Sequence, residues 1–141
     1  MKYLNTVKAK FICRPNRFIA FVEINGKKEV VHVKNTGRCK ELLLPNSDVF
    51  LSVADNPERK TKYDLITVDK CSNLVNIDSQ APNAAVEEWL KKGKLFSKKA
   101  AIKREFTYGK SRFDFYVEDG KRKAFIEVKG VTLEKEGIAY F

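Results

Sequence analysis

The chain has 141 residues, 43% of them hydrophobic and ten of them Phe, which suits one ordinary domain or two small ones and excludes a disordered tract. It carries 28 Lys and Arg against 18 Asp and Glu, and this net charge of +10 favours a polyanionic partner, most commonly nucleic acid. Residues 91–104 contain seven basic residues and no acidic one. The alternative is the solvated surface of an ordinary lysine-rich protein.

The cysteines, Cys13, Cys39 and Cys71, are far apart and odd in number, and with a single histidine the chain has no zinc-binding pattern. Such cysteine usage is typical of a reducing compartment, so we expect a cytoplasmic protein. No run approaches the roughly 18 apolar residues of a membrane span, and no membrane partner is expected.

The first 70 residues predict short antiparallel strands. Residues 18–24 and 28–33 flank Asn25-Gly26, a dipeptide typical of a two-residue type I′ turn, which pairs Ile24 with Lys27. Further strands are expected at residues 6–12, 48–54 and 64–70. Five such strands predict a barrel of the OB-fold type. The predicted core face of the hairpin consists of Phe18, Ala20, Val22, Ile24, Val31 and Val33.

The pattern changes near Gln80, where we place a domain boundary. Residues 81–94 predict an amphipathic helix, with Pro82 near its start and Gly93 after its last periodic residue. The apolar face of this helix would consist of Val86, Trp89 and Leu90. The chain is thus expected to have a barrel at residues 1–80 and a second domain at residues 81–141, giving a mixed α+β protein.

Two strands are predicted in the second domain, at residues 111–117 and 123–133, joined by a turn at Asp119-Gly120. This turn pairs Asp114 with Phe125 and places Asp114 diagonal to Glu127 on one face. Lys129, two positions after Glu127, points the same way. Phe113, Phe115, Val117, Ile126 and Val128 would face the core, and Tyr116 would lie on the face of Asp114.

Two carboxylates that converge beside an ammonium group suggest a site for a divalent cation. Like charges repel at this distance unless a cation lies between them, and Mg²⁺ takes one or two carboxylates together with water and phosphate oxygens. Such an ion lowers the pKa of bound water, and a neighbouring lysine stabilises developing negative charge, as phosphodiester hydrolysis requires. The alternative is a solvent-exposed hairpin face with an ordinary Glu/Lys pair.

Three motifs in order, "NTGR" at 35–38, "EFTYGKSRFDF" at 105–115 and "IEVKGVTL" at 126–133, resemble the sugar fermentation stimulation protein A family. The resemblance implies an OB-fold followed by a partial α/β domain of the PD-(D/E)XK, restriction-endonuclease-like class, and a DNA-binding protein. Family members continue beyond the final "GIAYF", so the resemblance also implies a C-terminally truncated member. A second copy of the chain, in a homo-oligomer, is the other way to complete the fold.

By this resemblance, Asp114 and Glu127 would hold Mg²⁺ or Mn²⁺, the carbonyl of Val128 would be a further ligand, and Lys129 would be the catalytic lysine. Glu105 would be an additional acid near the metal, the alternative being a solvated partner of nearby lysines. The residues expected to contact nucleic acid are Ser111 and Arg112 beside the first carboxylate, and Arg17, Lys34, Asn35, Thr36, Gly37 and Arg38 on the barrel.

Three functions remain open at this point. The first is a DNA-binding, metal-dependent nuclease, a deoxyribonuclease using Mg²⁺ or Mn²⁺. The second is a non-catalytic, sequence-independent DNA-binding or regulatory module linked to sugar metabolism, in which the nuclease motif is inert. The third is a structural domain with a basic surface, which predicts negligible DNA affinity at physiological salt. The sequence leaves open the choice between single- and double-stranded DNA.

Overall fold

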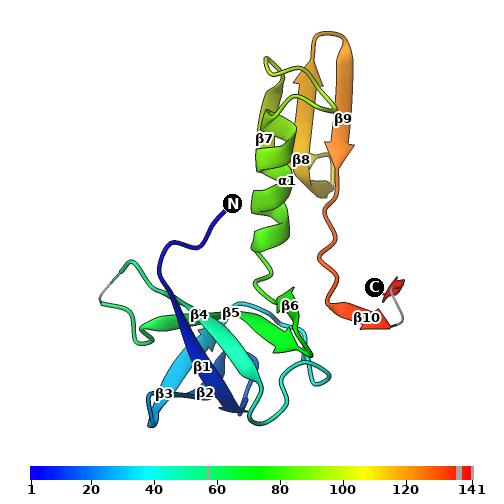
Figure 1. The fold of residues 1–141 in the computed structure, drawn as a ribbon. Helices are drawn as coiled ribbons and strands as arrows, with labels where there is room; N and C mark the ends of the chain where they lie inside the picture. Colours follow the sequence, from blue (N-terminus) through cyan, green and yellow to red (C-terminus); the bar gives the residue numbers. More distant parts are fainter. Residues whose placement is uncertain (57, 136–137, 141) are drawn as a thin grey trace. The chain divides into compact units, whose positions relative to one another are not determined.

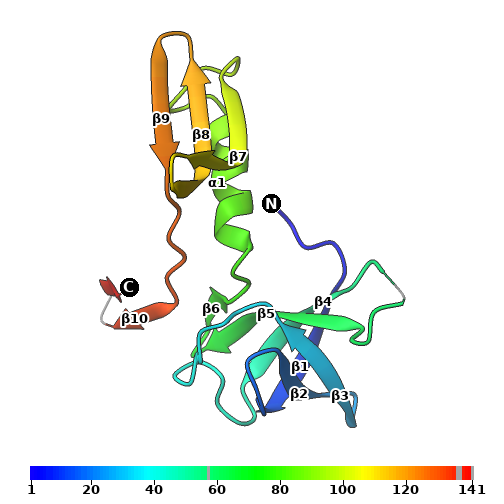
Figure 2. The same ribbon diagram turned by 180° about the vertical axis from the view of Figure 1, so that it is seen from behind.

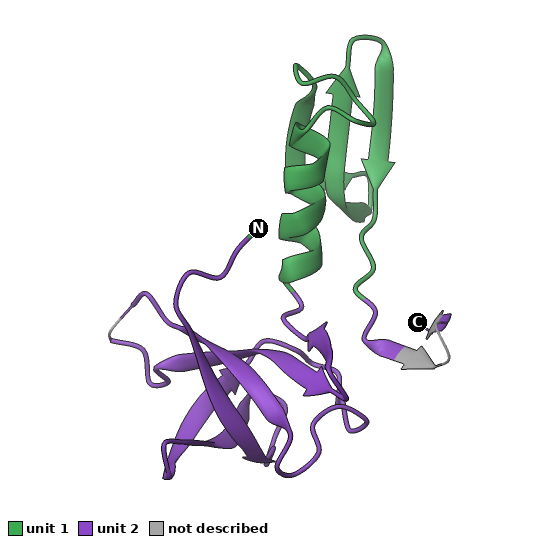
Figure 3. Ribbon diagram, in the orientation of Figure 1, with its two compact units in different colours: residues 1, 80–130 green, residues 2–79, 131–141 purple. Residues whose placement is uncertain are grey.

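The computed structural model describes residues 1–56, 58–135 and 138–140. It divides into two compact units, one of residues 2–79 with 131–141 and the other of residue 1 with 80–130 (Figure 3). Each unit has its own buried core. Within the described residues, no helix has the length and apolar character that crossing a membrane requires.

The barrel unit, residues 2–79 and 131–141, contains a closed five-stranded barrel of OB type, so that the predicted mixed α+β fold with an N-terminal barrel is confirmed (Figure 1). Neighbouring strands are antiparallel except β3 and β5, whose parallel pairing closes the barrel. A short β6 extends the sheet from β5. The strands are β1 (Thr6–Cys13), β2 (Ile19–Ile24), β3 (Lys27–Val33), β4 (Asp48–Val53), β5 (Tyr63–Lys70) and β6 (Asn73–Asn76).

The β2–β3 hairpin has the predicted register. Ile24 pairs with Lys27 across Asn25 and Gly26, whose φ angles of 50° and 75° are those that a type I′ turn requires. Most of the predicted core face is buried, namely Ala20, Val22, Val31 and Val33, with Ile24 packed against it. The prediction for Phe18 is wrong. Its side chain is 63% exposed, because β2 begins only at Ile19 and the Phe18 N–H is bound by Asn16 in the preceding turn.

The unit of residues 80–130 is a three-stranded antiparallel sheet with a helix on one face, as Figures 1 and 2 show from opposite sides. The strand order is β7-β8-β9, and the first of these strands was not predicted. The predicted strand at 123–133 is also too long, because β9 ends at Ile126. The elements are α1 (Ala81–Lys91), β7 (Ala101–Tyr108), β8 (Ser111–Asp119) and β9 (Arg122–Ile126), while β10 (Leu133–Lys135) and β11 (Ile138–Tyr140) group with the barrel.

Helix α1 has the predicted ends and packs through part of its predicted face. Pro82 lies in its first turn, and Gly93, with a φ of +73°, follows its last turn. Leu90 is 1% exposed and lies in a cluster with Phe115 and other apolar side chains of the sheet. Trp89 is 42% exposed, so its assignment to the core face is wrong.

The β8–β9 hairpin differs from the predicted register by two residues. Asp119 pairs with Arg122, so the turn is Gly120-Lys121, and Tyr116 rather than Asp114 pairs with Phe125. Gly120 has a φ of +60°, the conformation that a type II′ turn requires at its first central position. The Asp119 carboxylate accepts hydrogen bonds from the backbone N–H and the hydroxyl of Ser97, and these bonds hold it in the strand.

Candidate functional site

Asp114 lies on the helix side of the sheet, which corrects the predicted alternation in β8. The rings of Phe113 and Tyr116 both pack on Phe125, with centroids 4.6 and 5.3 Å apart, so Phe113 lies on the face away from the helix. Phe115 and Val117 pack in the cluster of Leu90, as predicted. The strand therefore turns both Asp114 and Phe115 toward α1.

Two hydrogen bonds fix the Asp114 carboxylate. Asn83, in the first turn of α1, donates from Nδ2 to Oδ1 over 2.9 Å, and the backbone N–H of Val128 donates to Oδ2 over 2.7 Å. Each carboxylate oxygen keeps a second lone pair for another ligand. The site is thus built where the first turn of the helix meets β8 and the segment that follows β9.

The segment after β9 lies close to the same turn of the helix. A Cβ atom added to Gly130 would come within 2.8 Å of Cγ of Pro82, so a larger residue at this position would displace the segment or the helix turn. The glycine of "VKG" therefore has a packing role. It allows the chain to run beside α1 and to present Glu127 and Lys129 next to Asp114.

The predicted acids line a common cavity of about 180 Å³. Its lining consists of Glu105, Arg112, Phe113, Asp114 and Glu127. Glu105 forms an ion pair with Arg112, and both side chains are more than half exposed. By the register of β7 and β8, Glu105 lies opposite Asp114, between the pairs that flank them. Ser111 begins β8 and is exposed, but it does not line the cavity.

Lys129 lies beside Glu127, with its Nζ 2.8 Å from Oε1. The hydrogen bond and the charge of Glu127 raise the pKa of Lys129, and the charge of Asp114 adds to this effect. Lys129 therefore stays protonated and faces both carboxylates. In the described part of the chain, no three side chains of His, Cys, Asp or Glu are grouped closely enough to hold a metal ion.

Some residues of the "NTGR" motif make hydrogen bonds that stabilise the barrel. Asn35 donates from Nδ2 to the carbonyl of Ile77 and accepts the N–H of Gly37. A Cβ on Gly37 would lie 2.9 Å from Oδ1 of Asn35. Lys34 pairs with Asp64 over 2.9 Å. The side chains on the solvent side are those of Arg17, Thr36 and Arg38.

Two residues of structural importance were not predicted from the sequence. Asn83 orients Asp114, and its place next to Pro82 at the start of a helix was the one signal for it. Arg14 donates hydrogen bonds to five backbone carbonyls of two loops. No pattern of spacing or charge in the sequence distinguishes it from the other arginines.

Comparison with known proteins gives matches along nearly the whole chain. The model for the SfsA N-terminal OB domain matches residues 12–77, and that for the sugar fermentation stimulation protein RE domain matches residues 80–141. Sugar fermentation stimulation protein homologs from Clostridium beijerinckii and Desulfitobacterium hafniense strain DCB-2 are each 60% identical over 141 residues. All of this chain is covered, against 62% and 61% of those proteins, so it spans somewhat less than two thirds of their length.

A solved structure, that of Pyrococcus furiosus SfsA in complex with Ca²⁺, resembles the chain with a TM-score of 0.81 at 28% identity. The similarity covers 96% of this chain and 60% of that one. The two domain models occur in the order of the two folded parts. This chain belongs to the sugar fermentation stimulation protein family.

Proposed function

We propose that the chain binds DNA and carries a site for metal-dependent hydrolysis of phosphodiester bonds at Asp114, Glu127 and Lys129. The observation that carries this proposal is the cavity lined by Asp114, Glu127 and Glu105, with Lys129 ion-paired to Glu127 at its edge. The OB domain and the net charge of +10 support DNA as the substrate.

The donor atoms at the site fit a hard divalent cation. Asp114 and Glu127 offer carboxylate oxygens, and the carbonyl of Val128 is a neutral oxygen donor, which is the set that Mg²⁺ and Mn²⁺ prefer. The Pyrococcus furiosus relative was solved with Ca²⁺, another cation that takes oxygen ligands. When bound, such an ion supplies Lewis acidity and a water of lowered pKa.

The protein groups would orient the reaction and stabilise its charge. Asn83 and the Val128 N–H hold the Asp114 carboxylate in one orientation. Lys129, kept protonated by Glu127, would donate to the phosphate oxygen on which negative charge grows. Water adds to phosphorus and one P–O ester bond breaks, which leaves a phosphate monoester and a hydroxyl.

The second candidate is a DNA-binding or regulatory module that does not cleave, with a role in sugar metabolism. Two observations favour it. Among the described residues no three-acid group is placed to hold a metal, and Glu105 and Glu127 each have a cationic partner. In this case the motif would serve the fold and the DNA contact alone.

The test measures cleavage of labelled DNA in Mg²⁺ or Mn²⁺, with Mn²⁺ binding followed separately by titration calorimetry. Lys129→Ala should abolish cleavage and keep Mn²⁺ affinity within about threefold, because the lysine acts on charge in the transition state. Asp114→Asn should lose both cleavage and Mn²⁺ binding. Asn83→Ala should weaken Mn²⁺ binding by about tenfold through the freed carboxylate.

The matched control is Lys121→Ala, at the exposed turn of the same sheet, which should cleave like the wild type. DNA binding by all variants with no cleavage by any of them, the wild type included, would establish the second candidate. Cleavage that survives Lys129→Ala would remove the lysine from the mechanism.

A further inference from the structure

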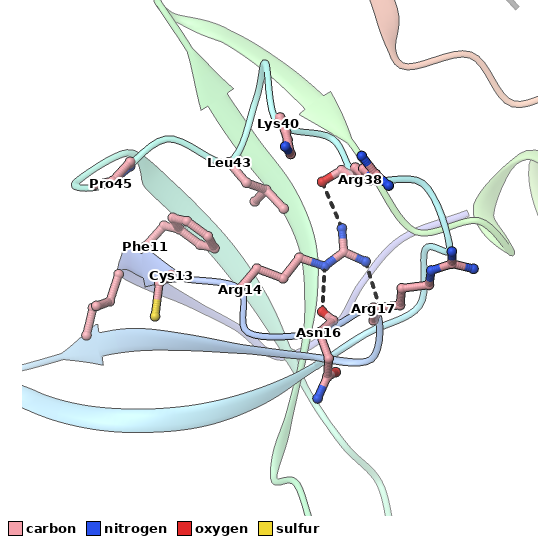
Figure 4. A pocket seen from close by; sticks show the side chains of 10 residues that line it. Phe11, Cys13, Arg14, Asn16, Arg17, Arg38, Lys40, Leu43 and Pro45 are labelled. Carbon is pink, nitrogen blue, oxygen red and sulfur yellow. Dashed lines mark hydrogen bonds between the residues drawn. The ribbon is translucent and has the colours of Figure 1, made fainter.

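A second cavity lies in the barrel unit, distinct from the acidic one. It has a volume of about 420 Å³, in the range of small-molecule sites. Its apolar lining includes the side chains of Phe11 and Leu43, which are 2% and 8% exposed, and that of Pro45. Figure 4 shows the end of β1 on one side of it and the segment of residues 38–45 on the other.

Arg14 fixes the wall of this cavity. All its N–H groups are used, on the carbonyls of Asn16 and Arg17 in one loop and of Asn35, Gly37 and Arg38 in the other, at 2.5–3.2 Å. In the view of Figure 4, Phe11 and Leu43 lie on one side of its guanidinium group and the Arg17 side chain on the other. The two loops are therefore joined before any ligand arrives, which lowers the entropy cost of binding.

Three cations on the rim have no ion-pair partner among the residues that the structure describes. The side chains of Arg17, Arg38 and Lys40 are exposed and line the cavity, and none of them forms an ion pair with another described residue. Arg14 adds a fourth positive charge, with its donors already used. An apolar floor beside three unpaired cations is complementary to a ligand with a flat apolar part and an anionic part.

We propose that this cavity is a nucleotide subsite, in which one unstacked base of a single-stranded DNA lies against Phe11, Leu43 and Pro45. The adjoining phosphates bind Arg17, Arg38 and Lys40. A base inside a duplex stack cannot enter such a cavity without being extruded, so the subsite selects single strands or frayed ends. This inference rests on the DNA binding proposed above and is independent of cleavage.

The first experiment measures how much of the binding affinity comes from the base and how much from the phosphates. Fluorescence anisotropy measures the affinity for a labelled 12-nucleotide dT strand and for an abasic strand of the same length and charge. The wild type should bind the dT strand about tenfold more tightly, because a base stacked in an apolar site adds affinity that phosphates do not supply. The double variant Arg17→Ala with Arg38→Ala should bind both strands about tenfold or more weakly than the wild type does. Lys27→Ala with Lys60→Ala, two exposed cations of the same unit outside the cavity, is the matched control and should change neither by more than about twofold.

The second experiment uses Cys13, an exposed thiol in the lining of the cavity. In a Cys71→Ser background, Cys13 is the remaining exposed cysteine, since Cys39 is buried and burial raises the pKa of its thiol. Its reaction rate with a thiol reagent should fall several-fold in the presence of the dT strand and much less with the abasic strand. The same rate is measured with dTMP in place of the strand. Protection by dTMP would show that a free nucleotide enters the cavity as well as a nucleotide held within a strand.

The outcomes distinguish the two proposals. Equal affinity for both strands with an unprotected Cys13 would overturn the subsite while DNA binding stands. Protection by dTMP without binding of either strand would show a free-nucleotide site and overturn single-stranded DNA as its ligand. Failure of both the strands and dTMP to bind would overturn the subsite, and failure of a labelled duplex to bind as well would overturn both proposals.

Discussion

Asp64 is the most strongly constrained charge of the barrel. Its side chain is 6% exposed and contacts two cations and a histidine ring, with Arg59 Nη2 at 2.7 Å, Lys34 Nζ at 2.9 Å and His32 Nδ1 at 3.0 Å. Burial alone would raise the pKa of this carboxyl, but the hydrogen bonds from Arg59, Lys34 and His32 outweigh it and lower the pKa well below its usual value. Asp64 is therefore ionised throughout the neutral range.

A depressed pKa makes the barrel sensitive to acid. The folded state binds the Asp64 proton more weakly than the unfolded state does, so the stabilisation is complete above the ordinary carboxyl pKa of 3.8. It is lost as the pH falls from there toward the lower pKa of the folded state. We expect the free energy of unfolding to decrease over that acidic range and to change little above about pH 5.

Replacing Asp64 by Asn should destabilise the protein by about 2–4 kcal/mol at pH 7, because Arg59 and Lys34 lose the negative charge they pair with and one accepting oxygen becomes an NH₂ group. Urea unfolding followed by circular dichroism measures this loss. The matched control is Glu23→Gln, an exposed acid of the same barrel without an ion pair to any described residue, which should cost less than about 0.5 kcal/mol. An Asp64→Asn protein as stable as the control would contradict the network's role.

Strand β7 carries a local irregularity at Glu105. Its φ of +53° is in the left-handed region, which costs a residue with a Cβ atom about 1–2 kcal/mol. Ile102 packs toward the helix, whereas Lys103 and Phe106, three positions apart, lie together over the other face. The irregularity thus reverses the alternation of the strand and turns Glu105 into the acidic cavity.

Two substitutions of Glu105 measure separately the cost of the backbone strain and the contribution of the carboxylate to metal binding. Glu105→Gly should be about 1 kcal/mol more stable than Glu105→Ala, because glycine adopts the positive φ without a steric cost. Both variants lose the same carboxylate, so each should weaken Mn²⁺ binding to a similar extent if Glu105 supports the metal. Thermal unfolding and calorimetry give the two values, and an alanine variant more stable than the glycine variant would argue against the strain.

The sequence-based predictions were correct where the structure is determined by neighbouring residues, and wrong where it depends on residues far apart in the chain. Asn25-Gly26 sets the β2–β3 hairpin through two residues, and its register was predicted correctly. Strand β7 was missed because its basic residues and the reversal at Glu105 remove the two-residue period. The β8–β9 register was wrong by two because Gly120 serves as the first rather than the second turn residue, a choice decided by Asp119 and its bonds to Ser97.

The candidate site was predicted as a set of residues and only partly as an arrangement. The motif indicated Asp114, Glu127 and Lys129, and these side chains do lie together. Asn83 could not be identified, because its contact with Asp114 joins elements 31 residues apart. The roles proposed for these residues stay predictions.

The positive charge of the whole molecule is divided evenly along the chain. Residues 1–80 and 81–141 each have 14 basic and 9 acidic residues, so both parts contribute to a field that attracts polyanions. Binding of this kind releases counterions, and affinity then falls steeply as salt rises.

The slope of log affinity against log salt counts phosphate contacts. For a single strand, each neutralised phosphate contributes about −0.7, so a slope near −4 would correspond to about six contacts. Removing Arg17 and Arg38 together should make the slope shallower by about 1.4. Anisotropy titrations between 50 and 200 mM salt measure both values, and a flat dependence would mean that charge does not drive binding.

The parallel pairing of β3 with β5 has a consequence for how fast the barrel folds. The β2–β3 hairpin joins near neighbours and can form within microseconds, whereas the seam that joins His32 to Asp64 must wait for a long loop to close. The buried Asp64 carboxylate lies on that seam, in contact with His32, Lys34 and Arg59. Acid would therefore remove an attraction between two strands that meet across a long loop, so the folding rate, and not only the final equilibrium, should fall with the protonation of one side chain.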